Sequence, residues 1–150
     1  MQSQWLMKSK IGSLYLVASD QGLQGIYWKK QKVKLTKSKI IVQAMSELEE
    51  YFLGKRRVFD LPLDLIGTPF QKSVWKQLQK IPYGKTLSYK EIARKIRNPK
   101  AVRAVGTANA RNPLCVIVPC HRVISADGSL GGYSGGVKKK KTLLNLEQGL

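Results

Sequence analysis

One stretch of nine residues, Val116 to Ile124, most constrains how this chain can fold. Its two apolar ends are typical of a buried strand. Four other residues interrupt the run, and they include the only histidine of the chain: Pro119, Cys120, His121 and Arg122. Polar groups are costly to bury unless they are hydrogen-bonded or used for chemistry. The stretch therefore predicts a buried strand that carries functional residues.

Cys120 is the candidate nucleophile of this stretch. A cysteine beside basic groups can become a thiolate, which is the reactive form. Neighbouring residues of a strand point to opposite faces, so His121 can help Cys120 only where the strand ends or through a water. A cysteine protease, with Asn112 or Glu147 orienting His121, is one interpretation, but it leaves the charge of the chain without a role. A thiolate also suits displacement at an alkyl carbon, such as that of an alkylated DNA base, and the thioether product would end the protein's activity after one event.

The charge of the chain indicates a polyanionic partner. The 150 residues include 27 Lys and Arg but only nine Asp and Glu, a formal charge of +18. Such an excess favours nucleic acid first and an anionic membrane second. Residues 1–66 hold 11 basic and six acidic residues, whereas residues 67–150 hold 16 and three. We therefore expect the polyanion at the second half.

Several other classes of protein fit the sequence poorly. Two cysteines, Cys115 and Cys120, are too few for a secreted disulfide scaffold, and no signal peptide or membrane-spanning run is visible. We expect a soluble, intracellular protein with no membrane partner. With His121 the cysteines offer at most three zinc ligands, without the usual spacing, so we predict neither a metal nor another cofactor. Cys115 is expected to be a small buried hydrophobe, with a role as second acceptor as the lesser alternative.

The first half predicts a small α/β unit without a catalytic grouping. Residues 13–19 and 23–28 are β-rich runs joined by a turn, which indicates a hairpin. Residues 29–39 are basic, and we favour a solvated loop over a second binding patch. Apolar residues at helical spacing follow over 41–52, and Gly54 ends that helix. Residues 54–69, which contain Gly and Pro breakers, connect the two halves.

The second half predicts a pair of short helices after a longer one. Apolar spacing favours a helix over 70–81, and Ser88 with Glu91 forms a capping box that opens the next. Asn98-Pro99 is expected to start a further helix that runs to about Arg111. The last two helices form a helix-turn-helix candidate. Small side chains on the second of them allow tight helix packing or, as we prefer, close approach to a DNA minor groove, with Arg103 as its long side chain.

A glycine-rich segment follows the candidate nucleophile. Residues 131–136 match neither a P-loop nor the dinucleotide-binding pattern, but their glycines let a ligand approach the backbone. Lys138 to Lys141 come next, as a phosphate contact or a solvated run. A closing helix with Leu143 carries Glu147, the only carboxylate near this end.

These motifs together resemble the O6-alkylguanine-DNA alkyltransferases. The resemblance rests on Pro119-Cys120-His121-Arg122-Val123, on Asn112-Pro113 before it and on Gly132-Tyr133-Ser134-Gly135-Gly136 after it. It extends over residues 69–146, including Ser88-Tyr89 and 98–106, and is only loose in the first half. It implies an α+β fold: a small ribonuclease-H-like α/β domain over 1–66 with a structural role, then a mostly helical, winged helix-turn-helix-like domain over 67–150 that binds DNA and transfers the alkyl group.

The resemblance also implies a role for each site residue. Cys120 would accept the alkyl group, His121 would deprotonate it through a water, and Glu147 would hold the tautomer of His121. Tyr89 would protonate the leaving guanine, and Asn112 would brace the chain before Cys120. DNA contacts are implied for Lys100, Ala101, Arg103, Ala104, Thr107 and Arg122, with Arg103 filling the place of the flipped base. The base pocket would be lined by Tyr133, Ser134 and Gly135 and by the backbones of Val118 and Val123.

The implied activity is direct reversal of DNA damage in a single turnover. The substrate would be O6-alkylguanine, and also O4-alkylthymine, flipped out of double-stranded DNA that is bound through its minor groove. A monomer in the cytoplasm at the nucleoid, or in the nucleus of a eukaryote, is expected, with cooperative assembly on DNA left open. Some relatives carry zinc in the first half, but no Cys or His precedes Cys115 here. Two alternatives stay open: a module that recognises damaged DNA with an inert Cys120, and a minor-groove architectural protein.

Overall fold

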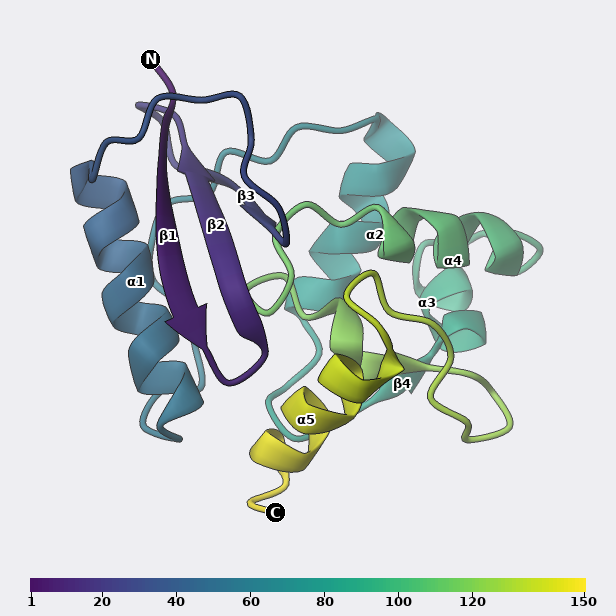
Figure 1. Ribbon diagram of the computed structural model, residues 1–150. Helices are drawn as coiled ribbons and strands as arrows, with labels where there is room; N and C mark the ends of the chain where they lie inside the picture. The colour runs from purple at the N-terminus through teal and green to yellow at the C-terminus, as the bar shows by residue number, and fades with distance from the viewer. The chain divides into compact units, whose positions relative to one another are not determined.

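The computed structural model describes residues 1–150 and contains two compact units, Met1–Ile66 and Gly67–Leu150. Unit 1 combines a three-stranded sheet with one long helix, and unit 2 is mainly helical (Figure 1). The prediction of an α+β fold is therefore confirmed. No helix is both long enough and apolar enough to cross a membrane.

The sheet of unit 1 is antiparallel, with the strand order β1-β2-β3. Its strands are β1 (Ser3–Ser9), β2 (Gly12–Ala18) and β3 (Leu23–Tyr27). The hairpin expected from residues 13–28 is confirmed as β2 and β3. The sequence pattern does not predict strand β1, because only Trp5, Leu6 and Met7 are apolar and they do not alternate with polar residues. It pairs with β2 from Ser3 opposite Ala18 to Ser9 opposite Gly12.

Helix α1 (Lys39–Phe52) lies alongside the sheet of unit 1 (Figure 1). Its N-cap is Ser38, whose side chain accepts a hydrogen bond from the amide of Ile41. One face buries Ile41, Ala44, Leu48, Tyr51 and Phe52, as their helical spacing predicts. Gly54 follows the helix with a φ of 75°, a conformation that favours glycine, so the predicted end of the helix is confirmed.

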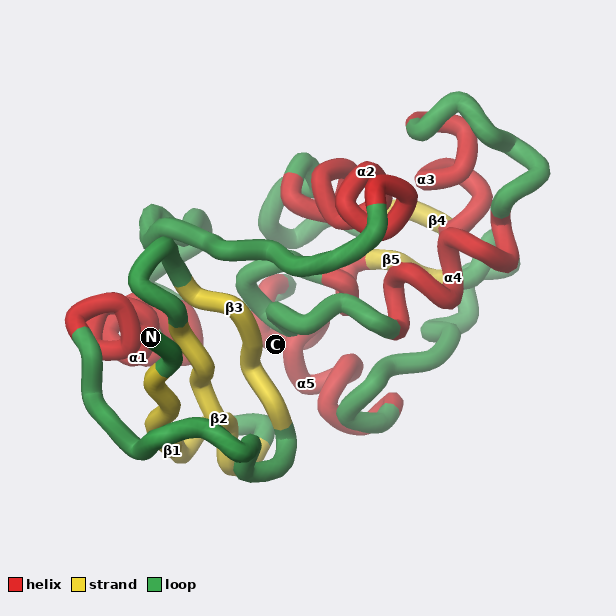
Figure 2. The backbone as a smooth tube through the Cα atoms, turned by 90° about the horizontal axis from the view of Figure 1, so that it is seen from above, coloured by secondary structure: helices red, strands yellow, loops and turns green.

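Unit 2 begins with two capped helices. The N-cap of helix α2 (Pro69–Gln79) is Thr68, and that of helix α3 (Tyr89–Lys95) is Ser88. Each of the two forms a complete capping box. The box predicted from Ser88 and Glu91 is therefore confirmed. The indole of Trp75 on α2 donates a 2.9 Å hydrogen bond to the carbonyl of Ala108 and so ties α2 to the next helix. Strands β4 (Leu87–Ser88) and β5 (Val123–Ile124) pair in parallel within this unit (Figure 2).

Helix α4 (Val102–Ala110) begins later than its sequence suggests. The prediction that Asn98-Pro99 opens it is wrong, because those residues form a turn in which the amide of Ala101 donates to the carbonyl of Asn98. Ala101 is the N-cap residue and provides no side-chain cap. The last helix, α5 (Val137–Glu147), starts at Gly136, whose φ is 101°.

The prediction of a strand over 116–124 is wrong except for its last two residues. Residues 115–117 form turns and Cys120–Arg122 form a 3-10 turn, while only Val123–Ile124 are strand. All residues from Leu114 to Val123 are buried. Their amides are satisfied by short-range bonds, such as Val118 to Leu114 and Arg122 to Pro119, so burial does not require a sheet partner here.

Candidate active site

The turns before Cys120 are fixed by the side chain of Asn112. Its amide nitrogen donates a 2.7 Å hydrogen bond to the carbonyl of Val118, and its oxygen accepts one of 3.0 Å from the amide of Leu114. Both Asn112 and the residues that it joins are buried. Val116, between them, has a φ of 74°, which is strained for a β-branched residue and persists where its surroundings hold it. Asn112 therefore holds a closely folded chain in front of the cysteine.

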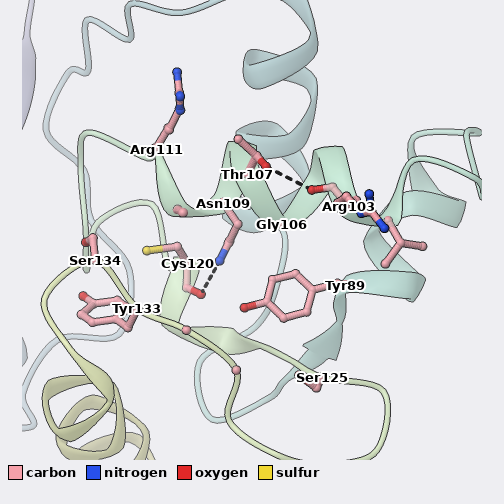
Figure 3. A pocket seen from close by; sticks show the side chains of 14 residues that line it. Tyr89, Arg103, Gly106, Thr107, Asn109, Arg111, Cys120, Ser125, Tyr133 and Ser134 are labelled. Atoms are coloured by element: carbon pink, nitrogen blue, oxygen red, sulfur yellow. Dashed lines mark hydrogen bonds between the residues drawn. The ribbon is translucent and has the colours of Figure 1, made fainter.

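Cys120 lies at the wall of a cavity of about 640 Å³ in unit 2, a size typical of small-ligand sites. Figure 3 shows the hydroxyl of Tyr89 directed toward Cys120, with helix α4 along one side of the cavity and Tyr133 and Ser134 on another. The lining residues are Tyr89, Val102, Arg103, Gly106, Thr107, Asn109, Ala110, Arg111, Cys120, Ser125, Gly131, Gly132, Tyr133 and Ser134.

Behind Cys120, a buried carboxylate joins a histidine and an arginine. Oε2 of Glu147 lies 2.7 Å from Nε2 of His121. Arg122 donates to both oxygens of the same carboxylate, from Nε at 2.8 Å and from the terminal nitrogen at 3.0 Å. Its other terminal nitrogen donates a 2.7 Å hydrogen bond to the carbonyl of Ile81. This two-point pairing fixes the carboxylate of Glu147 and, through it, the ring of His121.

The position of Glu147 defines the protonation of His121. A carboxylate at Nε2 makes that nitrogen the donor, which leaves the lone pair on Nδ1. Nδ1 is buried and has no hydrogen-bond partner in the protein. Burial lowers the pKa of His121, although the carboxylate of Glu147 acts in the opposite direction. His121 is therefore neutral at pH 7 and can act as a base at Nδ1.

Cys120 is a buried thiol rather than a preformed thiolate. Burial raises the pKa of the Cys120 thiol to about 11, although the Asn112 side chain and the charge of Lys140 act to lower it. The basic neighbours in the sequence do not decide its protonation, because desolvation of the thiolate outweighs them. Burial likewise raises the pKa of Cys115, which does not line the cavity. Cys120 is thus a thiol, which must lose its proton before it can act as a nucleophile.

Lys140 belongs to this site, and the sequence interpretation missed it. It is fully buried and donates to the carbonyl of Val123 at 2.6 Å and to that of Gly132 at 3.1 Å. Burial lowers the pKa of its amine to about 8, while the neighbouring Cys120 raises it. A signal for this burial existed, because Lys140, Leu143 and Glu147 recur at helical spacing and form the buried face of α5.

Gly131 lets the glycine-rich segment approach Tyr89. Its φ is 72°, and a Cβ at this position would lie only 2.9 Å from the Tyr89 hydroxyl oxygen. Any larger residue would force the hydroxyl end of Tyr89 to shift, and it would be strained at this φ. Gly131 therefore allows the backbone to lie close to the side chain of Tyr89. The sequence analysis expected a ligand, not a protein side chain, beside these glycines.

The structure brings some of the expected residues to the cavity and not others. Tyr89, Arg103, Thr107, Cys120, Tyr133 and Ser134 line it, whereas Val118, Val123 and Gly135 do not. Val118 and Val123 are buried, and their backbone carbonyls accept hydrogen bonds from Asn112 and Lys140. That their backbones line the base pocket stays a prediction.

The expected DNA contacts divide between the surface and the interior. Lys100, Arg103, Ala104 and Thr107 are exposed on or beside α4, and Ala101 is half-buried. Arg122 does not belong with them: it is buried, and its guanidinium is occupied by Glu147 and by the carbonyl of Ile81. The prediction of a DNA contact at Arg122 is therefore wrong. Its observed hydrogen bonds instead position the carboxylate of Glu147.

Comparisons with known proteins agree with this geometry. Residues 69–149 match the family model described as "6-O-methylguanine DNA methyltransferase, DNA binding domain", and residues 5–65 match the one described as "6-O-methylguanine DNA methyltransferase, ribonuclease-like domain". A methylated-DNA–protein-cysteine methyltransferase of Methanosarcina barkeri is 47% identical over 150 residues, with 95% of each chain covered. Another of the same name, from Mycobacterium leprae, is 46% identical over 148 residues, covering 95% of this chain and 90% of the relative.

Solved structures show the same likeness. The crystal structure of Mycobacterium tuberculosis OGT in complex with DNA has a TM-score of 0.92 and 43% identity, covering 98% of this chain and 93% of the other. The crystal structure of the O6-methylguanine methyltransferase of the same organism has a TM-score of 0.91 and 42% identity, covering 99% and 94%. The chain described here belongs to the 6-O-methylguanine DNA methyltransferase family.

Proposed function

We propose that Cys120 is the alkyl acceptor of this family's reaction, the direct reversal of DNA alkylation by transfer to a cysteine of the protein. The observation that carries the proposal is the position of Cys120: it is the only cysteine at the 640 Å³ cavity, and the neutral base His121 is its neighbour in the turn. The substrate is O6-alkylguanine in DNA, with O4-alkylthymine as a second substrate.

His121 and Glu147 supply the base that Cys120 needs. A thiol with a pKa of about 11 is almost wholly protonated at pH 7, so a proton acceptor must act during the reaction. The lone pair on Nδ1 of His121 takes this proton through one water, and Glu147 stabilises the imidazolium that forms. Arg122 acts as a positioning residue, because it fixes both oxygens of Glu147.

The transfer step is a displacement at carbon. The Cys120 sulfur forms a bond to the alkyl carbon while the bond from that carbon to O6 of guanine breaks, and the electron pair stays on the guanine. Tyr89 donates a proton to the leaving base. Burial raises the pKa of Tyr89, as does the neighbouring Cys120, so its hydroxyl holds its proton until the base becomes basic enough to take it. The thioether product is stable to hydrolysis, and each molecule therefore reacts once.

Helix α4 presents the surface that binds the duplex. Its exposed residues are small except for Val102 and Arg103, so the helix backbone can approach the floor of the minor groove. Lys100 and Thr107 contact phosphates, and Ala101 and Ala104 lie against the groove. Arg103 lines the mouth of the cavity and fills the place of the flipped nucleotide, whose removal costs roughly a few kcal/mol.

Mass spectrometry after incubation with duplex DNA that contains O6-methylguanine tests the acceptor. We expect one methyl group on the Cys120 peptide and none on the Cys115 peptide, in the ratio of one per protein molecule. The Cys120→Ser variant should bind the same duplex with unchanged affinity and gain no methyl group. Methylation at another residue would move the acceptor away from Cys120. Intact binding without any methylation of the unmodified protein would favour the alternative of a damage-recognition module.

The proposed setting follows from this chemistry. A reaction that uses one protein molecule per lesion needs no cofactor and no second subunit, so we propose a monomer that works where the DNA is, at the nucleoid in the cytoplasm.

A further inference from the structure

Unit 1 carries a concentrated positive charge that the proposed reaction does not use. Six lysines lie between Lys29 and Lys39, which we name the lysine segment: Lys29, Lys30, Lys32, Lys34, Lys37 and Lys39. No Asp or Glu occurs from Gln21 to Ser46. Outside the segment, unit 1 has five basic and six acidic residues, so the segment supplies all of its positive excess.

The backbone of the lysine segment is held in place by one buried side chain. Gln4 on β1 is fully buried, and its amide nitrogen donates 3.0 Å hydrogen bonds to the carbonyls of Gln31 and Val33. Its side-chain oxygen accepts a 2.7 Å bond from the amide of Gln31. Its backbone amide donates to the carbonyl of Lys34, and its carbonyl accepts from the amide of Thr36. Every polar group of Gln4 is therefore bonded to this segment.

The lysine side chains themselves point to solvent. All six residues are exposed, and none forms an ion pair with a carboxylate. Lys37 packs over the ring of Trp5 at 5.4 Å, and Lys37 and Lys39 line a hollow that also contains Glu47 and Glu50. The other four lysines, which do not line that hollow, form the uncompensated part of the segment: Lys29, Lys30, Lys32 and Lys34.

A simpler explanation is that the lysines protect an edge. Strand β1 is an edge strand of the sheet, and lysines at an edge discourage pairing with other chains. However, a β-bridge between Gln4 and Leu35 already pairs the lysine segment with this edge of β1, so the edge is covered at that end. A row of unpaired lysines on an ordered backbone repels its own members, and it is stabilised where counterions or a polyanion lie against it.

We propose that the lysine segment is a second DNA-binding surface, rather than the solvated loop that the sequence alone favours, and that it contacts the phosphate backbone without reading bases. Because Gln4 orders the backbone beforehand, binding costs little loop-ordering entropy. The surface adds affinity for undamaged and damaged duplex alike and does not change the chemistry at Cys120. The inference uses DNA as the partner of the proposed function, but it does not depend on which residue accepts the alkyl group.

The test measures the affinity of the full chain for an undamaged duplex over a range of salt concentrations. The variant Lys30→Gln, Lys32→Gln, Lys34→Gln is compared with a matched control, Lys8→Gln, Lys10→Gln, Lys55→Gln, which removes the same charge from exposed lysines of unit 1 outside the segment. We expect the segment variant to bind about tenfold more weakly at low salt. The slope of log K against log salt should become shallower by up to about 0.9 for each phosphate that the variant no longer neutralises. The control should change by less than about twofold.

Equally weakened binding in both variants would show an effect of net charge only and would overturn the proposal, as would unchanged binding in both. If the segment variant bound vesicles with anionic lipid more weakly than the unmodified protein but kept its DNA affinity, the result would overturn the proposal in favour of a membrane-binding surface. Transfer from the free base O6-methylguanine to Cys120 should be equal in all three proteins, which shows that each is folded. If that transfer fails in all of them, the proposed function is wrong, while the salt titration still decides the role of the segment.

Discussion

The turn that carries Cys120 has two sides, one facing the cavity and one facing the interior of unit 2. On the interior side, His121 and Arg122 are both hydrogen-bonded to Glu147, at 2.7 to 3.0 Å. Arg122 also donates to the carbonyl of Ile81 at 2.7 Å, and Glu147 accepts from the amide of Gly84 at 3.3 Å. On the cavity side, Tyr89, Arg103 and Ser134 surround space that a ligand can fill (Figure 3).

This difference separates stability from activity. Buried ionised groups must keep their partners, since a lone buried charge costs several kcal/mol. Side chains at the cavity already face open space, and trimming them leaves no buried charge without a partner. Interior variants should therefore lose both stability and activity, whereas cavity variants should lose activity alone.

The largest effect is expected for Glu147→Gln on the interior side. Arg122 loses its carboxylate and His121 loses the group that stabilises its imidazolium. The free energy of unfolding should fall by about 3 to 5 kcal/mol, and the transfer rate by roughly a hundredfold or more. Urea unfolding measures the change in stability, and single-turnover kinetics measure the transfer rate.

The control Glu50→Gln breaks the more exposed pair with Arg56 and should destabilise the protein far less. A stable but inactive Glu147→Gln variant would contradict the interior network as a source of stability.

Tyr89→Phe tests the cavity side. Loss of the hydroxyl proton should slow transfer at saturating DNA by about a hundredfold, because general-acid catalysis typically contributes this much. Stability should stay within about 0.5 kcal/mol of that of the unmodified protein. Stopped-flow transfer from duplex DNA and urea unfolding provide the measurements, with Tyr27→Phe in unit 1 as the control. An unchanged rate would deny Tyr89 the role of proton donor.

Arg103→Ala separates the binding of DNA from the chemistry. Without the side chain that fills the vacated stack, repair of duplex DNA should slow by about tenfold, the equivalent of about 1.4 kcal/mol. Transfer from free O6-methylguanine should not change, because no stack is opened. The control Arg94→Ala removes an exposed arginine of α3 that does not line the cavity. Equal slowing with both substrates would remove the wedge role of Arg103.

Lys140→Met affects both sides, since Lys140 joins Val123 of the interior to Gly132 of the cavity wall. Labelling of Cys120 by iodoacetamide in a Cys115→Ala background reports on the thiolate. Below the Cys120 pKa of about 11 the labelling rate should rise about tenfold per pH unit, except near the Lys140 pKa of about 8. There the rise should be less steep, because the amine loses the charge that favours the thiolate.

In Lys140→Met that charge is absent at every pH, so the rate at pH 7 should fall severalfold and the change of slope near pH 8 should disappear. Lys141→Met, at an exposed position of the same helix, is the control. A Lys140→Met profile that keeps the change of slope would assign it to another group.

Local signals in the sequence predicted much of the fold. The hairpin of β2 and β3, helix α1 with its end at Gly54 and the capping box at Ser88 depend on contacts between residues near in sequence, and each is found as expected. The prediction of a strand before Cys120 is wrong because a side chain intervenes. Val116–Val118 are apolar enough for a strand, but Asn112 satisfies the backbone of Val118 and Leu114, so the chain turns instead.

The sequence by itself determined the basic charge, the family to which the chain belongs and the choice of Cys120 as the candidate acceptor, because these depend on which residues are present and in what order. The tertiary structure alone decided the protonation of Cys120, the interior place of Arg122 and the burial of Lys140. Each of these depends on how much water a side chain loses and on a partner that lies far away in the chain. Arg122 bonds Glu147, 25 positions away in the sequence, and Ile81, 41 positions away. No local sequence pattern predicts such contacts.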